Sequence, residues 1–138
     1  MLDSIDTDFP EHRARPAGAP TPLGGLRVVD FSHFIAGPFA SMILADLGAE
    51  VLKIEAPKRG DDLRRYPPVH PKLDQGAPFL WSNRNKKSVA LDLKSAEGIA
   101  LARDLIVKAD VLLENFSSGV MKRLGLDYAE LAKVNPRL

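Results

Sequence analysis

The segment of residues 23–55 constrains the fold of this chain more than any other. Its sequence is LGGLRVVDFSHFIAGPFASMILADLGAEVLKIE. An apolar strand over residues 26–30 leads through a sharp turn at Gly37-Pro38 into a helix, and a second strand follows over residues 51–55. Such a unit places a helix N-terminus at the carboxyl edge of a parallel sheet, where backbone N–H groups and the helix dipole favour an anionic ligand. The pattern therefore predicts a site for a phosphate-bearing cofactor without specifying which one.

The predicted helix carries its own signals. Large apolar residues at Phe39, Met42, Ile43 and Leu47 recur at helical spacing and give the helix one apolar face. Gly48 suits the end of the helix, because glycine adopts the left-handed conformation of a helix stop without strain.

Further elements follow in an order typical of α/β proteins. Residues 56–78 form a long excursion rich in Pro, Gly, Asp and Arg, and Phe79-Leu80-Trp81 is a short packing segment. Two more strands are predicted over residues 88–92 and 110–114. Between them Ser95 caps a helix. The predicted buried face of that helix consists of Ala102, Leu105, Ile106 and Ala109.

We therefore predict an open, mostly parallel, Rossmann-like α/β sheet flanked by helices. Asp127 and Glu130 resemble a capping box for a last short helix. Four strands make a thin sheet of this type, so we expect an incomplete domain that belongs to a longer protein. We expect residues 1–22 to be a flexible leader and residues 23–138 to be the folded region.

Composition excludes several classes of function. The 138 residues carry a formal net charge of +1 and include no cysteine. A balanced charge argues against a general nucleic-acid or membrane binder, and no apolar run approaches the ~20 residues of a membrane span. Without cysteine there is no disulfide framework, which fits a cytoplasmic protein. His12, His33 and His70 share no ligand spacing, so we expect no metal site.

The first candidate site is the turn of residues 32–38, SHFIAGP. Its small residues allow a ligand to approach the helix start closely, although Gly37-Pro38 is equally well interpreted as a plain turn of the chain. His33 invites a catalytic role, but a lone histidine is more often a structural hydrogen-bonding residue. Both interpretations stay open.

Two further candidates involve the second and third predicted strands. Glu55 ends the second strand, where an acid binds a ribose hydroxyl in Rossmann-type units. The G-x-G-x-x-G fingerprint is absent, so a solvated strand end is an equal alternative. The turn of residues 83–88, NRNKKS, gathers three cations that either hold phosphates or form a solvated face. The long excursion adds a second basic cluster, partly neutralised by neighbouring acids, at Lys58, Arg59, Arg64 and Arg65.

The fourth candidate is Glu114-Asn115-Phe116, at the carboxyl end of the last predicted strand. Ligands of open α/β sheets bind at this edge. Asparagine offers a donor and an acceptor, and phenylalanine offers a flat apolar wall. The alternative is a strand-to-helix turn with Phe116 in the core.

Taken together, these segments resemble the N-terminal domain of the class III CoA-transferase family, which includes formyl-CoA and carnitine CoA-transferases and α-methylacyl-CoA racemases. The resemblance rests on the segment of residues 23–55 and on GDDLRR, NRNKKSVALDLKS, ADVLLENFSSGVMKRLGL and the closing NPRL, in family order. It implies that residues 23–138 are the N-terminal part of a CoA-binding, Rossmann-like domain.

The resemblance implies that the ligand is coenzyme A, bound as a substrate thioester. In such enzymes the first strand–helix turn lies beside the pantetheine and the reacting thioester, and the region of the third strand holds the nucleotide. The CoA-binding residues implied here are His33, Phe34, Ile35, Ala36, Leu91, Lys94, Asn115, Phe116 and Arg123, with Lys58, Arg59, Lys86 and Lys87 as further phosphate contacts.

Two positions depart from the family pattern. Ala56 stands where the family often has an arginine that contacts adenine, and Lys58 or Arg59 is a candidate substitute. Ile35 stands where formyl-CoA transferases often have glutamine, which argues against assuming oxalate or formate as the acid.

The transferases of this family move CoA from an acyl-CoA to a carboxylic acid through an Asp nucleophile, which we expect beyond Leu138. We expect the intact enzyme to be an interlocked homodimer. We expect the 138 residues alone to be inactive and to aggregate or pair with another chain. A racemase, a non-catalytic α/β binding module and a nucleotide-dependent oxidoreductase are the alternatives. The implied partners are an acyl-CoA and an acid, with no nucleic acid and no membrane.

Overall fold

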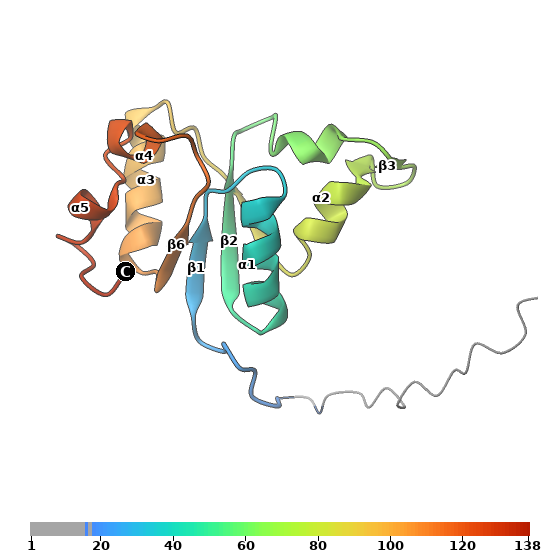
Figure 1. Ribbon diagram of the computed structural model, residues 1–138, viewed down its shortest axis with the longest axis horizontal. Coiled ribbons are helices and arrows are strands. Elements are labelled where there is room, and N and C mark those ends of the chain that lie inside the picture. The colour runs from blue at the N-terminus through green and yellow to red at the C-terminus, as the bar shows by residue number, and fades with distance from the viewer. Residues whose placement is uncertain (1–15, 17) are drawn as a thin grey trace, which may run out of the picture.

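The computed structural model describes residue 16 and residues 18–138. The predicted leader therefore lies largely outside the described residues. A four-stranded parallel sheet forms the centre of the fold (Figure 1), in the order β5-β2-β1-β6. The predicted open α/β sheet flanked by helices is confirmed. Its strands are β1 (Arg27–Asp30), β2 (Glu50–Glu55), β5 (Lys87–Ala90) and β6 (Val111–Leu113).

One long helix covers each face of the sheet, α1 (Ala36–Asp46) on one side and α3 (Ala96–Val107) on the other (Figure 1). Successive side chains of a strand point to opposite faces. Val28 therefore packs in a cluster with residues of α1, while its neighbour Val29 packs in a cluster with residues of α3. We call the two sides of the sheet the α1 face and the α3 face.

Several local signals of the sequence are confirmed. The Ser95 hydroxyl accepts from the backbone N–H of Gly98 at 3.0 Å and caps α3. Gly48 follows α1 with a φ of 101°, the left-handed value expected of a helix stop. The predicted capping box is wrong, because α5 (Tyr128–Leu131) begins after Asp127 without a side-chain cap bond. The short helix α4 (Val120–Arg123) precedes it.

Of the apolar face predicted for the first helix, Met42 is buried, whereas Phe39, Ile43 and Leu47 are exposed. The buried residues of α1 are mostly small: Gly37, Pro38, Ser41, Met42 and Ala45. Small residues let the helix lie close to the sheet, and a Cβ at position 37 would collide with the Ser32 side chain. The larger residues point outward and form an exposed row, the α1 stripe, made of Ile35, Phe39, Ile43 and Leu47.

The long excursion after β2 is folded. It contains the 3-10 helix η1 (Asp62–Arg65) and an antiparallel pair of two-residue strands, β3 (Val69–His70) and β4 (Gln75–Gly76). The helix α2 (Ala77–Ser82) follows and includes the predicted packing segment. Leu63, with no exposed surface, anchors the excursion in the interior. Among the described residues, no helix has both the length and the apolar character that crossing a bilayer requires.

Candidate functional site

The carboxyl edge of the sheet has a topological switch point between β1 and β6. The chain passes from β1 to β2 on one side and returns to β6 on the other, and ligands of open α/β sheets bind where this reversal occurs. Asn115 joins the two loops there. Its Oδ1 accepts from the His33 backbone N–H at 2.8 Å, and its Nδ2 donates to the His33 carbonyl oxygen at 2.9 Å.

This paired contact fixes the loop that carries the first candidate site. It extends the pairing of β1 with β6 through a side chain instead of a backbone. Phe34 follows with a φ of 65°, a left-handed conformation that a bulky residue rarely adopts. The constraint on His33 therefore accompanies a strained turn, from which Phe34 and Ile35 project with nearly half of their surface exposed.

A pocket of about 250 Å³ opens on the α3 face beside this turn, and we call it the edge pocket. It brings together four residues that the family resemblance implied: His33, Leu91, Lys94 and Phe116. The ring of His33 packs on that of Phe116 with centroids 5.1 Å apart. The other lining residues are Ile54, Glu55, Ala56, Asp92, Leu93, Val120 and Leu124.

Cationic side chains near the edge pocket have no protein partner. Within residues 18–138, the Lys94 ammonium and the Arg123 guanidinium make no hydrogen bond or ion pair. Lys94 lines the pocket itself, and Arg123 lies exposed on α4, whose Val120 is a lining residue. These two charges are thus available to an anionic ligand.

The opposite face of the same edge is occupied by a buried polar network. Asp30 ends β1 and has no exposed surface. One of its oxygens accepts from the backbone N–H of Ser32 at 2.9 Å and from the hydroxyl of the same residue. The other accepts from the Ser41 hydroxyl at 2.5 Å and the Lys86 ammonium at 3.2 Å. Burial lowers the pKa of Lys86 to about 8, although attraction to Asp30 opposes this shift.

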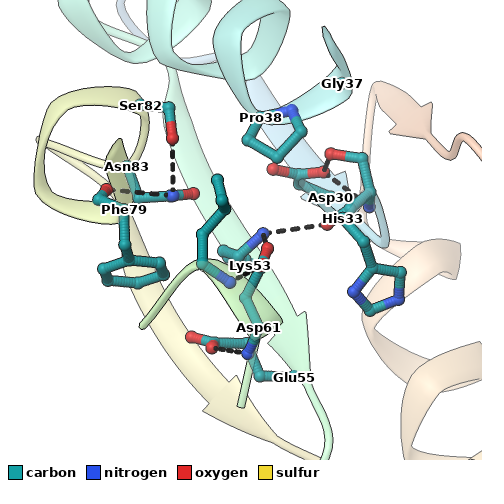
Figure 2. Close-up of polar contacts among 12 residues, drawn as sticks. Asp30, His33, Gly37, Pro38, Lys53, Glu55, Asp61, Phe79, Ser82 and Asn83 are labelled. Carbon is teal, nitrogen blue, oxygen red and sulfur yellow. Dashed lines mark hydrogen bonds and ion pairs between the residues drawn. The ribbon is translucent and has the colours of Figure 1, made fainter. Parts of the chain in front are cut away.

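A second ion pair lies beside the first. The Lys53 ammonium meets the Asp61 carboxylate at 2.9 Å, with side chains 2% and 0% exposed. Lys53 also donates to the Ser32 carbonyl oxygen at 2.8 Å, and Asp61 accepts from the backbone N–H of Leu63 at 3.0 Å. Figure 2 shows Lys53 and Asp61 pointing toward one another while the His33 ring points away from them.

Glu55 belongs to this network and is not the solvated strand end that the sequence left open. Its residue is 3% exposed. Its carboxylate accepts two bonds from Arg64, at 2.6 and 2.8 Å, and one each from the Ser88 hydroxyl and the Asp61 backbone N–H. Burial opposes ionisation, but the bonds to Arg64 and these partners outweigh it and lower the pKa of Glu55 to about 2. The carboxylate is therefore ionised and fully engaged.

The structure does not bring together the cations of the predicted basic turn. Arg84 and Asn85 bind the carboxylate of Asp46, the former at 2.5 Å. Lys87 pairs with Glu50, at the start of β2, at 2.7 Å. The remaining lysine of this turn is the buried partner of Asp30 described above.

Lys58 and Arg59 do not line the edge pocket but line a second pocket of about 360 Å³ in the excursion after β2. We call it the loop pocket. Arg64 lines the loop pocket and Glu55 lines the edge pocket. The ion pair between these two residues therefore links the linings of the two pockets. The lining residues are Lys58, Arg59, Arg64, Arg65, Val69, Asp74 and Gln75.

Sequence reasoning missed the buried pair of Lys53 and Asp61 and the role of Asp30. The signal lay in β2, where Lys53 and Glu55 alternate with apolar residues in a strand that a parallel sheet buries on both faces. Charges at such positions require buried partners. The described residues contain no group of three or more acidic, histidine or cysteine side chains that could hold a metal ion.

Comparison with known proteins gives one consistent family. The model described as CoA-transferase family III matches residues 23–138. The acetyl-CoA:oxalate CoA-transferase of Acetobacter aceti is 50% identical over 125 residues, which cover 91% of this chain and 31% of that protein. The succinate–glutarate CoA-transferase of Agrobacterium fabrum is 40% identical over 137 residues, which cover 96% of this chain and 32% of that protein.

Solved structures agree. A CAIB/BAIF family protein from Brucella suis is 43% identical with a TM-score of 0.81, covering 86% of this chain and 32% of that chain. A Mycobacterium tuberculosis protein in an orthorhombic crystal form is 44% identical with a TM-score of 0.79, covering 86% of this chain and 33% of that chain. The chain thus spans less than a third of the length of the curated relatives named here.

Proposed function

This chain belongs to CoA-transferase family III, and on that premise we propose that its carboxyl edge binds the acyl-CoA of an enzyme that transfers CoA to a carboxylic acid. The observation that carries the proposal is the edge pocket, where His33, Leu91, Lys94 and Phe116 converge from the segments that follow β1, β5 and β6 at the carboxyl edge of the sheet.

The chemistry of the edge pocket suits the parts of coenzyme A. Its largely apolar walls, including Leu91 and Phe116, offer a surface on which the adenine ring or the pantetheine arm packs. Lys94 and Arg123 carry unpaired charges for the phosphates. The strained turn at Phe34 and Ile35 then faces the thioester end of the ligand.

The residues of this chain bind and orient the substrate in the proposed reaction. The transfer itself requires a carboxylate that attacks the thioester carbonyl carbon, expels the CoA thiolate and forms a mixed anhydride; the thiolate then attacks the enzyme carbonyl of that anhydride, forms an enzyme thioester and releases the donor acid as a free carboxylate. The acceptor acid reverses the two steps, leaves as its CoA thioester and restores the enzyme carboxylate. We assign this nucleophile to no residue of the described chain. In Figure 2 the Asp30 and Glu55 carboxylates lie within the buried network, where their partners already occupy them.

We propose a short dicarboxylic acid as the acceptor. The support is that similar proteins carry names that specify oxalate, glutarate and, for a Chloroflexus aurantiacus subunit 46% identical over 117 residues, L-malate. An assay of the complete enzyme with oxalate, malate, succinate and glutarate tests this class, and transfer only to monocarboxylic acids would contradict it.

We further propose that the enzyme works in the cytoplasm as a homodimer. The support for assembly is the α1 stripe, whose four apolar residues are each between 39% and 47% exposed. Contiguous exposed apolar surface of this kind marks interaction sites. Light scattering on the eluting peak of a sizing column measures the assembly, and a monomer at micromolar concentration would contradict it.

Calorimetric titration of the complete enzyme with CoA tests the central proposal. We expect CoA to bind, NAD not to bind, and Phe116→Ala to weaken CoA binding about tenfold, because an aromatic wall contributes roughly 1–2 kcal/mol. The matched control is Leu101→Ala, which removes an exposed apolar side chain of α3 outside the pocket. An absence of CoA binding, or equal losses in both variants, would reject the proposal.

A further inference from the structure

The loop pocket has an unusual charge distribution for a surface hollow. Four cationic side chains line it, against the single acid Asp74. Arg64 is neutralised by Glu55, and Arg59 pairs with Asp62 at 2.8 Å. Lys58 and Arg65 make no hydrogen bond or ion pair through their side chains within residues 18–138. The cations that remain at this pocket are therefore Lys58 and Arg65, and Asp74 offsets one of their two charges.

Arg64 forms a fixed part of this pocket. Its Nε and Nη2 donate to Glu55, its Nη1 donates to Gln75 at 2.8 Å, and its guanidinium lies 3.9 Å above the centre of the Phe79 ring. A guanidinium has five N–H bonds, so two remain for a ligand. The bonds to Glu55 also raise the pKa of Arg64, so the charge persists at every working pH.

The backbone holds the other cations against this fixed group. Lys58 has a φ of 64° and Gly60 a φ of 66°, which turn the chain sharply directly after β2. At Gly60 a Cβ would lie 2.7 Å from the Arg64 side chain and 2.9 Å from Glu55, so only glycine allows this close approach. The turn therefore brings the backbone at Gly60 close to Arg64, and Lys58 lines the same pocket as Arg64.

We propose that the loop pocket is an anion subsite that binds a phosphate or carboxylate group of a substrate of this enzyme. The inference rests on the proposed function, because the edge pocket and the loop pocket adjoin through Glu55 and Arg64. A guanidinium with free N–H bonds beside an ammonium binds such groups through charge-assisted hydrogen bonds. Two sources supply this chemistry: the ribose 3′-phosphate of CoA, or the second carboxylate of a dicarboxylic acid.

The test compares CoA with dephospho-CoA, which lacks only the 3′-phosphate. The variant is Lys58→Ala/Arg65→Ala, which spares Arg64 because that residue also holds Glu55. The matched control, Lys72→Ala/Arg137→Ala, removes the same charges from exposed positions outside both pockets. Titrations of phosphate and succinate, followed by NMR shifts of the Arg64 and Arg65 amides, report on the loop pocket without CoA.

If the 3′-phosphate is the ligand, the unaltered chain binds CoA about tenfold more tightly than dephospho-CoA, and the variant loses this difference while its dephospho-CoA affinity is unchanged. If an acid carboxylate is the ligand, succinate shifts the two amides in the unaltered chain, and the variant loses this binding alone. Equal behaviour of variant and control in all four titrations overturns the proposal. Failure of both CoA and dephospho-CoA to bind rejects the proposed function instead, and the phosphate and succinate titrations still decide the loop pocket.

Discussion

The two faces of the sheet differ in how they hold charge at the same carboxyl edge. On the α1 face, Asp30, Lys53, Glu55 and Asp61 are at most 3% exposed, and each is paired with an opposite charge. On the α3 face, Lys94 lines an open, largely apolar pocket, and its ammonium has no partner among the residues that the structure describes. The charges of the α1 face are therefore neutralised within the protein, whereas the charge of Lys94 on the α3 face is available to a ligand.

The cause of this difference is the two-residue period of the strands. In β2, Lys53 and Glu55 alternate with Ile54, so their charged groups join the buried network while Ile54 packs in the core cluster that includes residues of α3. The buried charges hold the backbone around the binding turn, as the bond from Lys53 to the Ser32 carbonyl oxygen illustrates. At this edge, the paired buried charges position the backbone of the candidate site, and the unpaired charge of Lys94 is available to a ligand.

The largest effect is expected when one charge of the buried Lys53–Asp61 pair is removed. Asp61→Asn keeps the oxygen that accepts from Leu63 but leaves the Lys53 ammonium buried without a counter-charge. We expect the free energy of unfolding to fall by about 3–5 kcal/mol in urea titrations. The exposed pair provides the control: Lys87→Ala, which leaves Glu50 with Arg27 as its remaining partner, should cost less than about 1 kcal/mol. Equal losses of unfolding free energy would show that the buried pair of the α1 face contributes no more to stability than an exposed pair.

Lowering the pH should reduce the stability of the folded chain by protonating the buried carboxylate of Glu55. The pKa of Glu55 is lowered to about 2 in the folded chain from an ordinary value of 4.5, so the unfolded chain binds more protons between these values. The stabilisation is present above pH 4.5 and is lost as the pH falls toward 2, which amounts to about 2 kcal/mol between pH 6 and pH 3. Urea titrations at several pH values should show that Glu55→Gln loses this part of the acid sensitivity. The variant Glu97→Gln, at an exposed position of α3, should keep the full acid sensitivity.

Much of the architecture could be predicted from the sequence because it depends on local signals. The strand–helix–strand pattern of residues 23–55, the Ser95 cap and the helix stop at Gly48 each act within a few residues. The outward position of the α1 stripe could not be predicted, because periodicity finds an apolar face without saying which face the small residues bring against the sheet.

The candidate site likewise has one part that could be predicted from the sequence and one part that could not. Position at a strand end predicted that His33 and Asn115 would lie at one edge, because parallel strands end together. The fate of each cation could not be predicted, since Lys86 turns inward to Asp30 and Lys94 stays free. Pairing depends on contacts between residues far apart in the sequence, 56 positions in the case of Asp30 and Lys86.

A smaller effect, on affinity more than on stability, is expected where the two loops meet. Asn115→Ala removes both bonds to the His33 backbone, so the strained turn at Phe34 loses its constraint. We expect CoA binding to weaken about tenfold, with a loss of unfolding free energy of about 1–2 kcal/mol. The matched variant is Asn135→Ala, which removes two bonds to the carbonyl oxygens of Ile106 and Ala109 far from the pocket. It should lower stability and leave CoA affinity unchanged, and a parallel loss of affinity would contradict the positioning role.

The smallest effect should come from the free charge that defines the α3 face. Lys94→Ala removes an ammonium with no protein partner, so the unfolding free energy should change by less than about 0.5 kcal/mol. CoA affinity should fall about threefold, and by less at high salt, because a solvated contact to a phosphate is weak and screened. Lys108→Ala, at the other end of α3, removes the same charge away from the pocket and should change neither quantity. If Lys94→Ala destabilised the chain as strongly as Asp61→Asn, the division between a self-sufficient face and a ligand-binding face would fail, because the charge would then be holding the fold.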